Sequence, residues 1–215
     1  MIISYLSRGW KLFLAFPYLI IFTLVYQMIP VFLKPVINLP FTFFYFIFTF
    51  VCLEAFYRYP EAKNFTWGKE FLNILKRMII PGILLLSVLF SWSIISFFSL
   101  VALKVDMNLA GNVARVVAAV LVFITRTMTV FHGIYFAVEK RGFFESMNLS
   151  LNKFSKHAPF MIFVSVILLI FGIPTSYLGL QPPFLEYGLV TLSALVSLIL
   201  SATTVVYYKE KVKSN

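Results

Sequence analysis

Charged residues and cysteines are scarce in this sequence. Asp, Glu, Lys and Arg make up only 12% of its 215 residues, and Cys52 is the single cysteine. An ordinary soluble domain is about 25% charged, so the charge here is too little to cover a water-soluble globule. One cysteine excludes a disulfide framework, and a chain that is 61% hydrophobic is not disordered. The composition predicts an all-α, polytopic membrane protein.

Groups that carry catalysis are equally scarce. The two histidines, His132 and His157, do not stand at metal-ligand spacing with a cysteine or carboxylate. The sequence has no Gly-x-Ser-x-Gly motif and no glycine-rich phosphate loop before a helix. Because no set of catalytic roles can be filled, we do not expect an enzyme, and we assign no catalytic, cofactor-binding or metal-binding residue.

Long apolar runs divide the chain into membrane-crossing segments. A bilayer core about 30 Å thick needs roughly 20 apolar residues of helix. Five runs meet this requirement, and a sixth is interrupted by Arg126. Residues 1–215 are therefore expected to form one membrane helix bundle, with spans at about 12–33, 35–57, 79–103, 113–138, 159–180 and 185–208.

The basic residues decide between five and six crossings. Cytoplasmic loops carry an excess of Lys and Arg. Six crossings place fourteen Lys and Arg residues on the cytoplasmic side and three, Lys34, Lys104 and Arg115, toward the outer side. Five crossings would place the two most basic loops on opposite sides of the membrane. We therefore expect a multi-pass protein of the cell membrane with both termini in the cytoplasm.

The two longest cytoplasmic loops contain similar amphipathic segments, at about 66–78 and 143–156. Their apolar residues recur at helical spacing with a common offset of 76 residues. This pattern is typical of elbow helices lying in the membrane interface and indicates a parallel repeat, although any such loop can contain some amphipathic helix. The net charge of +10 lies beside apolar spans. The expected partner is therefore anionic lipid of the cytoplasmic leaflet, and not nucleic acid.

Arg126 makes the segment 113–138 the most informative part of the chain. A guanidinium near mid-membrane is costly unless it faces the bundle interior or water. On a continuous helix, Thr125, Arg126, Thr129, His132 and Gly133 fall within an arc of about 120°. This face predicts a polar pathway or an anion-binding site. The alternative is a structural ion pair that fixes how two helices meet.

Glu54, inside the second expected span, is the favoured partner of Arg126. Their expected depths differ by about 7 Å, which a long arginine side chain could largely cover. Arg58, four residues after Glu54, is the competing partner. The candidate site residues are therefore Arg126, Thr125, Thr129, His132 and Glu54.

The last expected span contains serines at four-residue spacing, and small residues at this spacing let helix backbones approach closely. Packing within the chain is the default for this serine face, and a homo-oligomer or a partner membrane subunit is the alternative. The serines are Ser193, Ser197 and Ser201.

The layout resembles the YesL-like family of small bacterial membrane proteins. It is also similar in outline to the membrane domains attached to some glycerophosphodiester phosphodiesterases. The resemblance implies the six-span architecture and carries no site residue or activity. It rests on Leu39-Pro40-Phe41-Thr42, on Leu75-Lys76-Arg77, on the elbow from Glu145 to Phe154 and on the basic tail.

The preferred function is transport, as a small permease or an accessory subunit of a transporter. The polar face at Arg126, the repeat, and the prolines Pro17, Pro30 and Pro174 within or beside spans are recurrent features of transporters. The alternative is a non-transporting scaffold that binds lipid or partners through the elbows. The scarcity of reactive groups disfavours a lipid-directed enzyme.

Overall fold

The structure, a computed structural model, describes the backbone of residues 2–32, 35–61, 65–102, 120, 123–177 and 183–213. It describes the side chains of those ranges except 27–43, 46, 85–86, 88–102 and 172–187. Every regular element in the described ranges is a helix and none is a strand, which confirms the all-α expectation.

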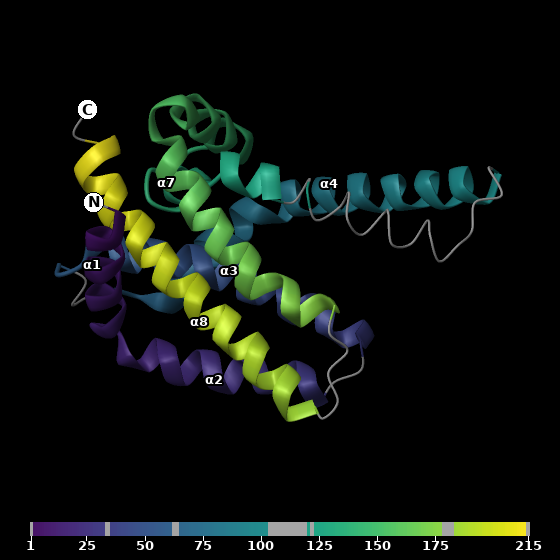
Figure 1. Ribbon diagram of the computed structural model, residues 1–215, viewed down its shortest axis with the longest axis horizontal. Coiled ribbons are helices and arrows are strands. Elements are labelled where there is room, and N and C mark those ends of the chain that lie inside the picture. The colour runs from purple at the N-terminus through teal and green to yellow at the C-terminus, as the bar shows by residue number, and fades with distance from the viewer. Residues whose placement is uncertain are drawn as a thin grey trace.

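Helix α8 is the element around which the others gather (Figure 1). It contacts α1, α2, α3 and α7, while α4 packs against α3 and α7 and then extends away from the bundle. Both chain termini lie at the same end. The helices are α1 (Ile2–Leu14), α2 (Pro17–Phe32), α3 (Pro35–Arg58), α4 (Trp67–Ala102), α6 (His132–Ala137), α7 (Phe143–Tyr177) and α8 (Pro183–Tyr207), followed by a π-helical turn at Tyr208–Val212.

Two helical stretches within the described ranges are long and apolar enough to cross a membrane, Phe143–Phe171 and Gly188–Val212. A third crossing is counted if the bent pair of α1 and α2 forms one span. These stretches support a membrane protein. Most of the expected span 79–103 and the first part of 113–138 lie outside the described side chains, and six crossings stay a prediction.

The first expected span, 12–33, is divided in the structure. Helix α1 ends at Leu14, α2 begins at Pro17, and the two are bent by 81°. Proline disfavours helical geometry in the residue before it and itself fits the first position of a new helix. Pro17 therefore accounts for a break that the apolar run alone does not reveal.

Each expected elbow helix continues into the span that follows it. Helix α4 runs through Pro81 and α7 runs through Pro159, so neither proline ends a helix. An amphipathic stripe and an apolar run share the same helical period, and a helix can retain an internal proline at the cost of a hydrogen bond. The elbows and spans are thus distinguished by side-chain polarity and not by a break in the backbone.

A glycine fixes the closest approach between α1 and α8. A Cβ atom at Gly9 would lie 2.6 Å from the Cα and N atoms of Thr203, so only glycine fits there. Ala202 and Thr203 are fully buried beside Ser201. This part of α8 thus packs against α1 within the chain at Thr203, and the packing of the serine face stays a prediction.

Candidate functional site

A cavity of about 220 Å³ lies where the segment 123–133 meets α3, α7 and α8. Arg126, Thr129 and His132, three of the five candidate residues, line it together with Gly133. The other helices supply Thr49, Phe50, Leu53, Val164, Leu168, Ser197, Leu200, Ser201 and Thr204. Polar groups from three parts of the chain therefore meet in one cavity of a largely apolar bundle.

The helix expected at 113–138 is interrupted beside this cavity. Its described part is helical at 123–128, turns at 129–131 and resumes as α6. At the turn, the His132 N–H donates to the Thr129 carbonyl at 2.9 Å, which is a bond across three residues and not four. A broken helix exposes backbone groups that need new partners inside a membrane.

Ser150 of α7 supplies those partners. Its Oγ accepts from the Phe131 N–H at 3.2 Å and donates to the Met128 carbonyl at 2.9 Å. Ser150 is fully buried. One side chain therefore bridges the two sides of the break and fixes the segment that carries the cavity residues. Ser150 is not predictable from the sequence, because nothing local marks a serine on one helix as the partner of a turn about 20 residues away.

The cavity residues share a side even though the helix is broken. Arg126, Thr129 and His132 are three residues apart, and residues at this spacing stay aligned in the tighter geometry of a 3₁₀ turn. Gly133 allows close approach to α3, since a Cβ there would lie 2.5 Å from Leu53 Cδ1. Thr125 is not among the lining residues, and its carbonyl accepts from the backbone N–H and the hydroxyl of Thr129.

Two nitrogen groups on residues that line the cavity lack partners within the described part of the chain. His132 is 8% exposed and its Nε2 atom has no hydrogen bond. Phe50, Phe136 and Phe143 surround its ring, with centroids 4.7 to 6.0 Å away. The Arg126 side chain is exposed, lines the cavity and forms no ion pair with a described acid. Arg126 thus lines the cavity without an acid partner among the described residues, whereas the Nε2 atom of His132 is enclosed by protein.

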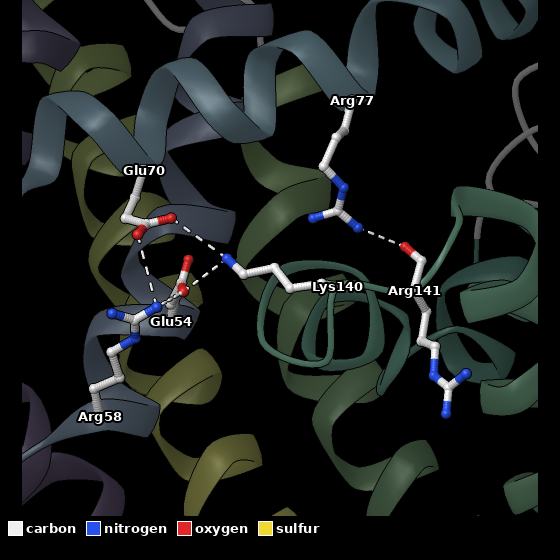
Figure 2. Close-up of polar contacts among 6 residues, drawn as sticks. All are labelled: Glu54, Arg58, Glu70, Arg77, Lys140 and Arg141. Atoms are coloured by element: carbon white, nitrogen blue, oxygen red, sulfur yellow. Dashed lines mark hydrogen bonds and ion pairs between the residues drawn. The ribbon is translucent and has the colours of Figure 1, made fainter.

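Glu54 lies in a separate ion cluster, which we define as Glu54, Arg58, Glu70 and Lys140 (Figure 2). Its carboxylate is 1% exposed and accepts from Lys140 Nζ at 2.7 Å and from Arg58. Glu70 lies 3.4 Å from Lys140 and 3.7 Å from Arg58. The favoured Arg126–Glu54 pair is therefore wrong. Glu54 pairs instead with Arg58, the competing partner, and with Lys140.

The cations of the ion cluster favour the ionised form of Glu70. Burial alone would raise the pKa of Glu70, but the charge and hydrogen bond of Lys140 outweigh it, with help from Asn73 and Arg58. The pKa of Glu70 is consequently below its ordinary value. Glu70 belongs to the expected elbow, so the ion cluster joins α3 and the first turns of α4 to the loop after α6.

Lys140 adopts a left-handed backbone conformation, with φ of 58°. A non-glycine residue pays about 1 kcal/mol or more for this conformation. The ion pairs of its amine account for lysine at a position that glycine would occupy more easily. Next to it, the Arg141 carbonyl accepts from Arg77 Nη2 at 2.5 Å, and the Arg77 guanidinium lies 4.1 Å from the centroid of the Phe136 ring (Figure 2).

In comparisons with known proteins, no protein-family model, no curated protein and no solved structure matches the chain. The resemblance to YesL-like proteins stays a prediction. In the described ranges, no three His, Cys, Asp or Glu side chains gather as a metal site would require.

Proposed function

We propose that the protein is a multi-pass protein of the cell membrane that takes part in transport, as a small permease or an accessory subunit of a transporter. The proposal includes six crossings and cytoplasmic termini. The observation that carries it is Arg126, which lines a cavity beside a broken helix and forms no ion pair with an acid in the described part of the chain. Discontinuous helices at binding sites recur in transporters, because irregular backbone at membrane depth is tolerated where it lines a cavity.

The cost of an unpaired charge supports a ligand-binding role for the cavity. An ionisable group within a membrane segment is expensive, and such groups mark substrate or ion pathways by default. Arg126 is not compensated by Glu54, whose Oε1 atom is paired with Arg58 and Lys140. A transported or bound anion is the natural partner for the remaining charge.

A second candidate is a non-transporting scaffold that binds anionic lipid. The supporting observation is the apolar side chains that stand exposed on the elbows, Leu72 at 54% and Phe144 at 59%. Lys69 and Lys156, on the same two elbows, are also exposed. Exposed apolar and basic side chains on one helix are typical of attachment to the membrane interface.

Labelling of engineered cysteines tests the topology. In a Cys52→Ser background, a membrane-impermeant maleimide should reach Lys69→Cys and Lys156→Cys only from the cytoplasmic side. It should reach Arg115→Cys only from outside. Labelling of Lys69→Cys and Lys156→Cys from opposite sides would remove the crossing at 113–138 and with it the transport proposal.

Flux into liposomes tests transport. Liposomes with the protein should accumulate at least one small anion from a panel of phosphate, sulfate, glycolate and acetate faster than empty liposomes. Arg126→Gln should abolish that flux, whereas Thr125→Ala, which changes a neighbour outside the cavity lining, should retain it. Flux that Arg126→Gln leaves unchanged, or no flux from any protein, counts against a permease and favours the scaffold.

A further inference from the structure

A second hollow, which we call the basic pocket, lies where α1 meets the C-terminal ends of α3 and α8. Its volume of about 500 Å³ is in the range of pockets that hold small molecules. Among the described residues it shares no lining residue with the cavity at Arg126. Five of its lining residues are polar and exposed: Arg8, Lys11, Tyr59, Lys209 and Glu210. The other four are apolar: Leu12, Phe56, Val205 and Val206.

These two groups of lining residues divide at the expected membrane boundary. Every apolar one falls inside the first, second or last expected span, and every polar one falls beyond the end of such a span. The three span ends are those expected at the cytoplasmic face. Leu12 and Val206 are half-buried and keep accessible apolar surface, whereas Phe56 and Val205 are fully buried. A molecule in the basic pocket would therefore contact both charged and apolar side chains.

The basic pocket has an excess of positive charge, because three cations and one acid line it. Glu210 pairs with Arg8, and both side chains are 43% exposed, so this is a weak surface ion pair that can rearrange around a ligand. Lys11 forms no ion pair with an acid in the described part of the chain. Lys209 forms none there either, and its amine lies 4.7 Å from the centroid of the Tyr57 ring. Two positive charges are therefore left for an anionic group.

Aromatic side chains at the basic pocket are typical of a membrane interface. Tyr59 in its lining is 45% exposed, and Trp10, next to Lys11 on α1, is 46% exposed. Tryptophan and tyrosine are enriched at the level of the lipid headgroups, because each has an apolar ring and a polar N–H or O–H group. The basic pocket therefore suits the depth of the headgroups better than the bulk cytoplasm.

We infer that the basic pocket binds the phosphate headgroup of an anionic membrane lipid, with phosphatidylglycerol as the representative chemistry. Lys11, Lys209 and Arg8 bind the phosphate, and Leu12 and Val206 contact the glycerol and the first carbons of an acyl chain. Basic pockets between helices on the cytoplasmic side are typical sites for such headgroups. A free phosphate compound has the same charge but leaves the apolar residues uncovered. The inference rests on the proposed topology and not on transport, and its site is separate from the elbows.

Binding to the purified protein in an uncharged detergent at low salt tests the inference. Calorimetry compares dioctanoyl phosphatidylglycerol with dioctanoyl phosphatidylcholine, which has the same acyl chains but no net charge. Phosphatidylglycerol should bind about tenfold or more tightly, and glycerol phosphate, which has no acyl chain, should compete only weakly. Equal affinity for the two lipids would overturn the inference. Glycerol phosphate competing as well as phosphatidylglycerol would assign the basic pocket to a free solute and reject the lipid.

Matched double variants locate the binding. Lys11→Gln with Lys209→Gln removes two cations of the basic pocket and should weaken phosphatidylglycerol binding about tenfold or more. Lys69→Gln with Lys156→Gln removes the same charge from the elbows and should change the affinity less than about threefold, because salt screens distant charges. All four lysines are exposed, so both double variants should fold. Equal losses in the two double variants, or a loss in the elbow variant alone, would overturn the inference.

Glu210→Gln gives a test that a folding defect cannot imitate. The change removes the acid that lines the basic pocket and releases Arg8 from its ion pair, so phosphatidylglycerol should bind about threefold or more tightly. Unchanged or weaker binding would show that the charge of the basic pocket does not hold the headgroup, and would overturn the inference. Lipid preference without flux in liposomes leaves the inference standing and rejects a permease, whereas flux without lipid preference does the reverse.

Discussion

The segment 123–142 contributes residues to two polar regions, the ion cluster and the cavity, and these differ in how their charges are compensated. In the ion cluster, the buried Glu54 has two cations within contact, and Glu70 approaches the same two. At the cavity, Arg126 has no acid partner among the described residues. The two regions therefore differ in charge balance and not in every hydrogen bond, because Glu54 Oε2 and His132 Nε2 are both buried without one. Charges that satisfy one another hold helices together, whereas unsatisfied ones require a ligand.

Burial follows the same division. The Glu54 carboxylate is 1% exposed, while Lys140 and Arg58 are 44% and 47% exposed, so the cations reach from the surface to a buried acid. Removing a cation leaves the buried Glu54 carboxylate with less compensating charge. Removing Glu54 leaves only cations that water can solvate. Loss of a cation from the ion cluster should therefore destabilise the protein more than loss of Glu54.

The largest effect is expected for Lys140→Met. This change leaves the buried Glu54 with Arg58 alone and should lower the free energy of unfolding by about 2 to 3 kcal/mol. Lys140→Gly should cost about 1 kcal/mol less, because glycine relieves the left-handed backbone at this position. Unfolding from mild detergent by dodecyl sulfate, followed by tryptophan fluorescence, measures both.

Lys156→Met is the matched control for that experiment. Lys156 is an exposed lysine of α7 without a recorded ion pair in the described part, so its loss should change stability by less than about 0.5 kcal/mol. Equal destabilisation by the two methionine variants would show that the ion cluster does not hold the fold together.

An intermediate effect is expected for Ser150→Ala. The change leaves the Phe131 N–H and the Met128 carbonyl unsatisfied at the helix break and should cost about 1 to 3 kcal/mol. It should also weaken anion binding, because the turn that places Thr129 and His132 loses its support.

Ser146→Ala provides the comparison for Ser150→Ala. Ser146 is equally buried on α7, but its hydroxyl donates to the Gly142 carbonyl within its own stretch of chain. Its loss should therefore be nearly neutral for the unfolding free energy and for binding. If the two alanine variants behave alike, Ser150 does not position the cavity.

The cavity residues were predictable from the sequence because residues three apart lie on the same side of both an α-helix and a 3₁₀ turn. Arg126, Thr129 and His132 stay on one side through the break, whereas Thr125 does not follow them into the cavity lining. The helical class and apolar segments were likewise predictable from composition and periodicity.

The ion pairs were not predictable in the same way. Lys140 reaches Glu54 across 86 residues, and no local pattern encodes a contact over that separation. The favoured partner for Glu54 was chosen by membrane depth alone, which ranks candidates along one axis and ignores where a loop returns. Arg58 could be named because an i,i+4 pair depends only on helix geometry.

The smallest effect on stability is expected for Arg126→Gln, and it is the sharpest test of the difference between the two regions. The same change at Arg58 removes a contact to the buried Glu54 and should cost about 1 to 2 kcal/mol. At Arg126 no described acid is lost, so the unfolding free energy should stay within about 0.5 kcal/mol or rise as an uncompensated charge is removed. Anion binding should disappear in Arg126→Gln and persist in Arg58→Gln.

If Arg126→Gln destabilises the protein as much as Arg58→Gln does, the guanidinium already has a partner within the chain, and the cavity is another structural ion site.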